Sequence, residues 1–310
     1  MEFREVVRLE GDIDGVIPVY VIMALTDGRY VTATYSLGKL ALWAPDGQLL
    51  EVIGNGPGEG PGEFDYPSGF VQVAEDEFLV LMGLPTIHKY STAGRFLRSF
   101  QLPAGGGALW AVTHGGAAIT SAGTPDGERG FLLEGDSIRV LDIHGRAVLL
   151  HLAAADDVGI WSAESDRYVL RRHALPSGVV TDSLMPARDW FPGPRENEAH
   201  LSWIHAGGRG LIWTVVEVAD PDAPPGSLPT WDIGGPEEEP IDEEALLASA
   251  IKTRDTVVEA FTPDGRLVAS VRFDSFRDAA IPMRGNLWYR MTEDMMTLVV
   301  LEAVLTQRPG

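Results

Sequence analysis

The chain has 310 residues, enough for one large domain or two ordinary ones, and 45% of them are hydrophobic, as in folded proteins. It carries 24 Lys and Arg against 45 Asp and Glu, and this net charge of −21 argues against binding to nucleic acid or to anionic lipid surfaces. Cysteine is absent, which excludes disulfides, thiolate metal ligands and a cysteine nucleophile.

The N-terminal segment is predicted to be a strand without a hairpin partner of its own. Residues 3–11 read FREVVRLEG and alternate in polarity, and their charges make them unlike a signal peptide. No run of about 18 apolar residues predicts a membrane span.

From residue 18 onward, short apolar runs alternate with turns that recur in two interleaved series. In the first series a residue tolerant of positive φ separates two alternating strands, as a tight hairpin requires: Gly47, Gly94, Gly145, Gly178 and Gly265. The second series has six members: Gly28, Asp76, Gly115, Asp166, Gly208 and Gly285. Two hairpins in each period of roughly 45 residues make a four-stranded antiparallel sheet, the blade of a β-propeller, so six turns predict six blades.

The last interval of the second series is 77 residues, whereas the others are 39 to 51. Residues 219–253 account for the excess, because they are rich in Pro, Gly and acid and do not resemble strands. We predict that they form an insertion within blade five. Inside it, residues 240–254 predict a short helix with Asp242 as its N-cap. This helix either packs on its own blade or serves as a lid or a partner-docking element.

The two ends of the chain are predicted to share one blade. Residues after 279 supply only three candidate strands, so residues 3–11 would pair beside residues 297–305 as the fourth strand of blade six. Such closure removes the open sheet edge that invites aggregation. We therefore predict an all-β fold, a six-bladed β-propeller of four-stranded antiparallel blades, as a single domain over residues 1–310. Two β-sandwiches would need a central linker, which residues 150–165 do not provide.

Residues 54–67 (GNGPGEGPGEFDYP) and the strands after them carry a family pattern. They resemble the NHL-repeat and bacterial six-bladed propellers, in which a G-x-G-x-G-x-F-x-x-P linker precedes an inner strand. The matching residues are Gly62, Phe64, Pro67, Tyr90, Gly94 and Phe96. The resemblance is specific over residues 50–103 and implies the fold but no activity, because this fold hosts many. Related bacterial proteins are commonly exported, which implies a periplasmic or extracellular location, with no signal peptide present in this chain.

Aromatic residues mark a candidate ligand site. Five of them are predicted at comparable places on the inner strands of blades one to five: Tyr20, Phe70, Trp110, Trp161 and Trp203. If they point to one channel mouth, they form a ring suited to sugars, peptides or flat ligands. If they point between blades, they are core packing.

Histidine gives a second candidate site. None of the seven histidines has a compact metal-binding spacing such as HExxH. Propellers can nevertheless assemble a metal site from several blades, and His114 and His205 are predicted near the ends of inner strands. The resemblance reaches the gluconolactonase and amidating-lyase groups, which implies Ca²⁺ or Zn²⁺ in the channel, although neither ligand set matches residue by residue. Each histidine could equally be a turn or core residue.

Two classes of function follow from these patterns. The first is a non-catalytic binding propeller, without a cofactor, that presents its channel mouth and insertion to a protein, peptide or glycan. The second is a metal-assisted hydrolase or lyase with one Ca²⁺ or Zn²⁺ in the central channel. No GxSxG motif supports nucleophilic hydrolysis. Whether the protein is an enzyme is left open by the sequence, and nucleic acid is not an expected partner.

Overall fold

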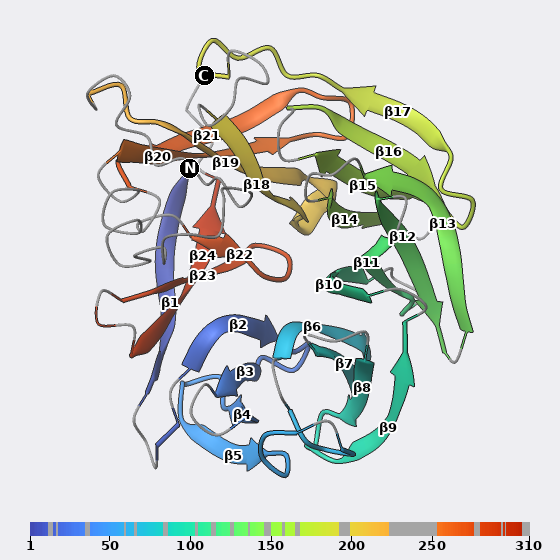
Figure 1. Ribbon diagram of the computed structural model, residues 1–310. Helices are drawn as coiled ribbons and strands as arrows, with labels where there is room; N and C mark the ends of the chain where they lie inside the picture. Colours follow the sequence, from blue (N-terminus) through green and yellow to red (C-terminus); the bar gives the residue numbers. More distant parts are fainter. Residues whose placement is uncertain are drawn as a thin grey trace, which may run out of the picture.

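The computed structural model contains six four-stranded antiparallel sheets arranged as blades around a common centre (Figure 1). This confirms the predicted all-β, six-bladed propeller. The structure describes residues 1–11, 15–16, 18–34, 38–58, 60–64, 67–82, 86–102, 105–112, 116–124, 127–135, 137–145, 150–156, 159–164, 168–191, 199–222, 253–275, 280–292, 294 and 296–305. Within these residues, the chain forms no helix with the length and apolarity that a membrane span requires.

The first strand of each blade lies innermost, and the others follow outward. Blade 1 contains β2 (Pro18–Ala24), β3 (Tyr30–Thr34), β4 (Lys39–Trp43) and β5 (Leu49–Ile53). Blade 2 contains β6 (Pro67–Ala74), β7 (Glu77–Met82), β8 (Thr86–Ser91) and β9 (Phe96–Gln101). Blade 3 contains β10 (Gly105–Val112), β11 (Ala118–Thr124), β12 (Gly127–Glu134) and β13 (Ser137–Gly145).

The second half of the ring follows the same order. Blade 4 contains β14 (Leu150–Asp156), β15 (Gly159–Glu164), β16 (Leu170–Ala174) and β17 (Val180–Leu184). Blade 5 contains β18 (Ala199–Ala206), β19 (Ile212–Ala219), β20 (Arg254–Phe261) and β21 (Leu267–Phe273), with the 3₁₀ turn η1 (Gly208–Gly210) between its first two strands. Blade 6 contains β22 (Ile281–Pro282), β23 (Leu287–Met291), β24 (Thr297–Val304) and β1 (Glu2–Glu10).

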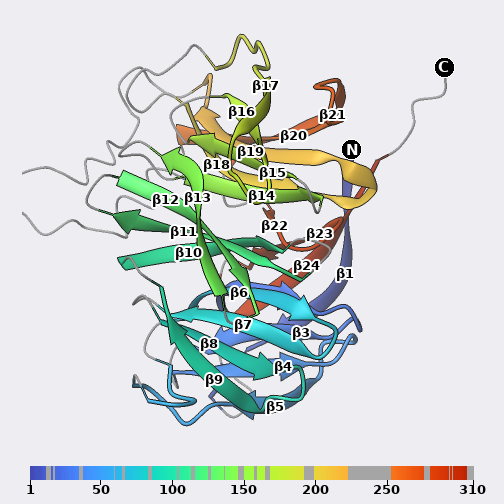
Figure 2. The same cartoon turned by 90° about the vertical axis from the view of Figure 1, so that its right-hand side faces the viewer.

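The N-terminal strand closes the ring as predicted. β1 runs antiparallel beside β24, from Glu2 opposite Val304 to Glu10 opposite Thr297, and the side view in Figure 2 shows the two strands together. Leu9 is fully buried between blades 6 and 1. The turn at Gly47 packs on this strand so closely that an added Cβ would lie 2.2 Å from the Arg8 carbonyl oxygen. Blade 1 is therefore locked onto the closing strand.

Apolar packing between neighbouring blades holds the ring together. β20 is buried at every position because other blades lie against both of its faces, whereas the outer strand β21 is exposed at every second residue or so. Between blades 5 and 6, the rings of Trp213 and Trp288 meet edge to face, with their centroids 5.3 Å apart. Such interleaved faces explain why the strands of a blade read as continuous apolar runs.

The turn assignment predicted for blades 3 and 4 is wrong. Gly145 ends β13, and β14 already belongs to the next blade, so no hairpin joins these two strands. The outer hairpin of blade 3 turns instead at Gly135, whose φ is +57°. The segment around Asp166 joins the second and third strands of blade 4 instead of the first and second. The predicted number of blades is still right, because each blade contains one turn of the second series.

Residues 220–253 connect β19 to β20, the second and third strands of blade 5. The predicted helix over residues 240–254 lies outside the described residues, except at its end. The predicted end is wrong by one residue, because Arg254 already begins β20 and its backbone is paired opposite Ala219.

The alternation of strand direction gives the ring two distinct faces. In an antiparallel blade, the innermost strand starts on the same face on which the second strand ends and the third begins. We call this side the insertion face, because residues 220–253 leave blade 5 there. The opposite side carries the tight turns between the first and second strands. Figure 1 shows the innermost strands β2, β6, β10, β14, β18 and β22 around the centre of the ring.

Candidate functional site

Four polar residues of blade 5 form a hydrogen-bonded group on the insertion face. His200 and Ser202 come from the start of the innermost strand β18, Glu217 from the end of β19, and Arg254 from the start of β20. We call these four residues the mouth cluster. His200 lies directly opposite Glu217 in the strand pairing, and a register shift between residues 201 and 203 brings Ser202 toward both. The cluster therefore depends on a bulge in the innermost strand.

The hydrogen bonds of the mouth cluster run in one direction. Arg254 Nη1 lies 3.3 Å from His200 Nδ1, and His200 Nε2 lies 3.2 Å from Ser202 Oγ. The Ser202 hydroxyl donates to Glu217 Oε1 at 2.7 Å. Arginine carries donors only, so His200 Nδ1 must accept and the proton of the neutral imidazole sits on Nε2. The order of donation is thus Arg254 to His200 to Ser202 to Glu217.

The four residues differ in exposure: Arg254 is buried, whereas Glu217 and His200 are partly exposed. The Arg254 side chain is 1% exposed and its Nη1 lies 3.9 Å from Glu217 Oε2, which makes a buried counterion for the carboxylate. Glu217 is 20% exposed and His200 is 37% exposed. Burial lowers the pKa of His200, the Glu217 carboxylate raises it, and the Arg254 guanidinium lowers it, so that the net direction is downward. This direction, like the donor that Arg254 places at Nδ1, favours the uncharged imidazole.

The ends of the 220–253 connection are tied to the sheet beside the cluster. The Asp220 backbone N–H donates to the Thr253 carbonyl at 2.9 Å, one step beyond the last pair of β19 and β20. Arg272 on β21 donates from Nε to the buried Asp255 carboxylate at 2.5 Å and from Nη2 to the Ala219 carbonyl at 3.1 Å. These bonds hold Glu217 and Arg254 on a rigid frame.

A buried network fixes the chain that leads into β18. Arg188, from the segment between blades 4 and 5, donates from Nε to Glu259 on β20 at 2.8 Å. Tyr168 donates its hydroxyl to the same carboxylate at 2.6 Å and also contacts Thr214 Oγ1 at 2.7 Å. Glu259 and Thr214 are fully buried, so these bonds compensate for the burial of polar groups. The network joins blade 4 to blade 5.

The structure separates the five predicted aromatic residues. Tyr20, Phe70, Trp110 and Trp203 lie on innermost strands, but Trp161 lies on β15, the second strand of blade 4, where it is buried against blade 5. The inner-strand placement of Trp161 is therefore wrong, and its cause is the shifted turn assignment in blade 4. Phe70 packs against the core between blades 1 and 2, and Trp203 against the core between blades 5 and 6. The side chains of Tyr20 and Trp110 lie outside the described part of the structure.

The predicted metal ligands are only partly described. His114 lies outside the described residues. His205 is the last residue but one of β18, on the side opposite the insertion face, where its Nε2–H donates to the Gly285 carbonyl at 3.1 Å. Burial lowers the pKa of His205 to about 4, although the bond to Gly285 acts in the other direction. Among the residues that the structure describes, no three His, Asp or Glu side chains gather as a metal site would require.

A second serine–histidine pair is part of the core. Ser162 Oγ lies 2.7 Å from His173 Nε2, and His173 Nδ1 lies 2.8 Å from the Gly178 carbonyl. The carbonyl can only accept, so Nδ1 carries the proton and the serine donates to Nε2. Both side chains are buried, and a ligand therefore has no access to them. The mouth cluster differs because its imidazole is partly exposed.

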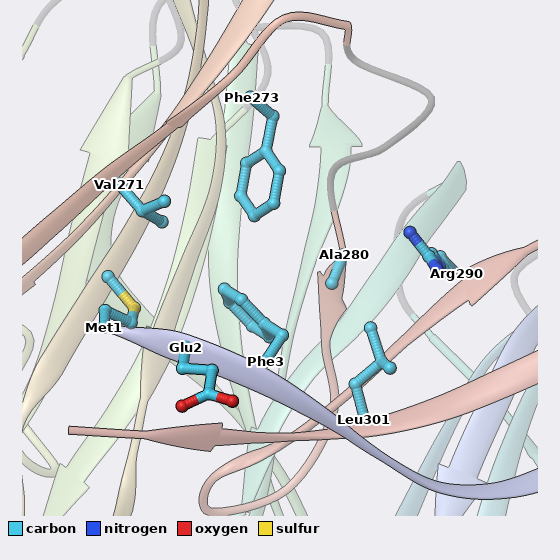
Figure 3. Close-up of a pocket in the computed structure, with 8 residues that line it drawn as sticks. All are labelled: Met1, Glu2, Phe3, Val271, Phe273, Ala280, Arg290 and Leu301. Carbon is cyan, nitrogen blue, oxygen red and sulfur yellow. The ribbon is translucent and has the colours of Figure 1, made fainter. Parts of the chain in front are cut away.

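A small groove of about 220 Å³ lies elsewhere, at the outer junction of blades 5 and 6 (Figure 3). Its apolar lining includes Phe3 and Phe273, whose ring centroids are 5.7 Å apart, and Glu2 and Arg290 add charged groups. Phe3 also meets Trp288 edge to face at 5.3 Å. These contacts anchor the closing strand β1, so the groove belongs to the ring closure.

The mouth cluster was not recognised from the sequence. His200 is one of seven histidines, and only the alternation His200–Leu201–Ser202 at the start of an inner strand sets it apart. Glu217 and Arg254 are separated by the whole 220–253 connection, so no local motif contains them. The long connection itself is the signal that could have drawn attention to the strand ends beside it.

Solved structures share the fold. A DUF4221 family member from Bacteroides vulgatus ATCC 8482 is similar with a TM-score of 0.65 and 9% identity, over 97% of this chain and 96% of that one. Virginiamycin B lyase from Staphylococcus aureus gives 0.59 and 13%, over 98% and 100%, and its catalytically inactive variant with quinupristin gives 0.57 and 13% over the same shares. No protein-family model and no curated protein sequence matches the chain. At these identities the likeness shows a six-bladed propeller and nothing about activity.

Proposed function

We propose that the protein is a non-catalytic binding propeller that holds its ligand at the mouth cluster on the insertion face. One observation carries this proposal: the hydrogen bonds of the cluster leave His200 without a free lone pair. Arg254 occupies Nδ1 and Nε2 carries the proton, so this imidazole cannot take a proton from Ser202 as the histidine of a hydrolytic triad does. Its N–H is donated to Ser202 instead, so the four side chains form a fixed polar group. The second oxygen of the Glu217 carboxylate is the acceptor that this group offers to a ligand.

The rigidity of the surrounding frame supports binding. The Arg272 bonds hold the strand ends that carry Glu217 and Arg254, and the Glu259 network fixes the chain that leads into β18. Preorganised polar groups bind with a smaller loss of conformational entropy than mobile ones do. The protein, peptide or glycan nature of the ligand, a kinship with NHL-repeat propellers and a periplasmic or extracellular location belong to the same proposal. They draw on the family pattern of residues 50–103.

The test uses the full chain on peptide and glycan arrays, followed by mass spectrometry of every ligand that binds. We expect binding that His200→Gln weakens, with the ligand recovered unchanged. Met185→Ser is the matched control, because Met185 is 75% exposed and lies outside the mouth cluster. A ligand that is hydrolysed or eliminated during incubation, with or without added Ca²⁺ or Zn²⁺, would overturn the proposal in favour of the metal-assisted enzyme. Binding that His200→Gln leaves unchanged would also overturn it.

A further inference from the structure

We infer that the groove at the outer junction of blades 5 and 6 is a second binding site, which takes a small ligand with an apolar body and a carboxylate. The apolar walls of the groove hold the body, and the Arg290 guanidinium pairs with the carboxylate (Figure 3). The groove shares no residue with the mouth cluster, so this inference goes beyond the proposed function and does not depend on it.

The alternation of side chains along β23 places Arg290 in the groove. Trp288 points toward blade 5, where it meets Trp213 edge to face, and Arg290 lies two residues further along the same strand. Successive side chains of a strand point to opposite sides of the sheet, so Arg290 also faces blade 5. Trp288 is fully buried, whereas Arg290 is only half-buried. The guanidinium therefore lies where the apolar interface between the two blades meets solvent.

The charge of Arg290 is not used by its neighbours. Within the described residues, its guanidinium forms no hydrogen bond and no ion pair. Glu5 attracts it, but both carboxylate oxygens of Glu5 already accept from Arg8 at 2.9 Å. Glu2 lines the groove too, yet it is exposed, and Figure 3 shows Glu2 and Arg290 at opposite sides of the lining. A half-buried guanidinium of this kind binds a carboxylate more strongly than a fully solvated one, because less water screens the pair.

The lining and the volume of the groove define the apolar body of the ligand. Phe3 and Phe273 present two tilted rings, and Val271 and Leu301 add aliphatic surface. The volume of about 220 Å³ exceeds the roughly 150 Å³ of an engineered cavity that holds benzene, and it is smaller than the roughly 300–1,000 Å³ of a drug-sized site. One aromatic ring, or an alkyl chain of similar size, with a short arm to its carboxylate matches this space.

Other ligand classes fit the groove less well. A neutral apolar molecule would cover the guanidinium without replacing the water that solvates it, which costs free energy. An amine or a metal cation would be repelled by Arg290. An inorganic anion such as phosphate could pair with Arg290, but it would leave the apolar walls exposed to water and so forgo the burial of apolar surface.

The first arm of the test uses the full chain with ¹³C-methyl-labelled valine and leucine. During titration with 3-phenylpropanoate we expect saturable shifts of the Val271 and Leu301 methyl signals in ¹H–¹³C NMR spectra. The matched ligands 3-phenylpropanamide and 3-phenylpropylamine keep the ring and the chain but lack the carboxylate, so they should bind roughly tenfold more weakly or worse. An absent response to the carboxylate, or an equal response to all three ligands, would overturn the inference.

The second arm changes the guanidinium. Arg290→Met keeps an apolar stem and removes the charge, so the affinity for 3-phenylpropanoate should fall roughly tenfold or more, whereas Arg290→Lys should retain part of it. Arg139→Met is the matched control, because Arg139 is an exposed arginine of blade 3 with only a 3.6 Å pair to Glu134, and it should leave the affinity unchanged. If Arg290→Met does not fold, the three ligands on the wild type still decide. Wild-type affinity in Arg290→Met would contradict the assignment.

The third arm locates the ligand by its effect on ring closure. Phe3 belongs to the closing strand β1 and Phe273 to blade 5, so a ligand between them stabilises β1 in its place. In hydrogen–deuterium exchange, 3-phenylpropanoate should slow the amides of β1 and leave those of blade 3 unchanged. Slowed exchange in blade 3 with none in β1 would place the ligand elsewhere and refute the groove as its site.

Discussion

Blades 2 and 5 use the same side chain in opposite ways. His88 on β8 is 1% exposed and lies among the rings of Phe64, Tyr90 and Phe96, and burial lowers its pKa. His200 on β18 is 37% exposed and hydrogen-bonded within the mouth cluster. The first imidazole fills space in a blade interface, whereas the second is held in a hydrogen-bonded polar group, where it donates its N–H to Ser202. Neighbouring groups, and not the residue type, decide what a propeller histidine does.

The difference begins in the chain that precedes each blade. Ahead of blade 2, the glycine-rich segment folds back on itself: the Asn55 N–H donates to the Gly62 carbonyl at 2.6 Å, and the Phe64 N–H to the Gly56 carbonyl at 2.9 Å. This compact loop inserts Phe64, fully buried, between blades 1 and 2. Blade 5 instead directs polar residues to the insertion face, where water and ligands have access.

Deletion of residues 1–10 should have the largest effect, because blades 2 and 5 both belong to a ring that β1 closes. The deletion removes the buried side chains of Val7 and Leu9, whose burial stabilises the fold by roughly 1.5–3 kcal/mol each, and it leaves β24 as an open sheet edge. We expect the free energy of unfolding in urea to fall by at least about 3 kcal/mol, or the protein to aggregate. Unchanged unfolding would refute the closed ring.

Phe64→Ala should affect the core between blades 1 and 2 and leave blade 5 unchanged. Removal of this fully buried ring leaves a cavity beside Tyr90 and is expected to cost about 3–5 kcal/mol of stability. The long-range ¹H–¹⁵N NMR signals of the His200 ring should stay the same, since blade 5 is not in contact with this core. Met185→Ser serves as the surface reference and should change stability by less than about 0.5 kcal/mol. A Phe64 variant as stable as the wild type would contradict the packing role of the connector.

Acid titration sharpens the distinction between buried and exposed histidines. The pKa of His205 is about 4 in the folded chain, below its ordinary value of 6.5, so the unfolded chain binds the proton more readily. The stabilisation is complete above pH 6.5 and is lost as the pH falls toward 4, by at most about 3 kcal/mol. Urea unfolding at several pH values should show this slope, and His205→Gln should flatten it. An equally steep slope in the variant would show that other groups carry the acid sensitivity.

The periodic turns of the sequence suffice to predict the number of blades and the closing strand. Glycine or aspartate between short apolar runs is a local requirement of tight hairpins, so it is legible without any tertiary knowledge. The prediction failed in blades 3 and 4, where Gly145 looks like a hairpin glycine but precedes a change of blade. The same error placed Trp161 on an inner strand.

The mouth cluster could not be predicted, because its four residues come from three strands and one long connection separates two of them. Aromatic residues on inner strands were a reasonable guide to a site, yet the described ones, Phe70 and Trp203, turn into blade interfaces. Sequence position assigns a residue to a strand, whereas strand register and bulges decide which side chains meet.

By itself, the amino-acid sequence determined that apolar faces recur at blade intervals and that head and tail must pair to leave no open edge. These are consequences of local turn chemistry and of periodic burial. Only the tertiary structure decided that the buried Arg254 guanidinium donates to the partly exposed His200 imidazole, and therefore which ring nitrogen of His200 carries the proton. Hydrogen bonds between distant strands depend on distances of a few tenths of an ångström, and no periodicity in the chain encodes them.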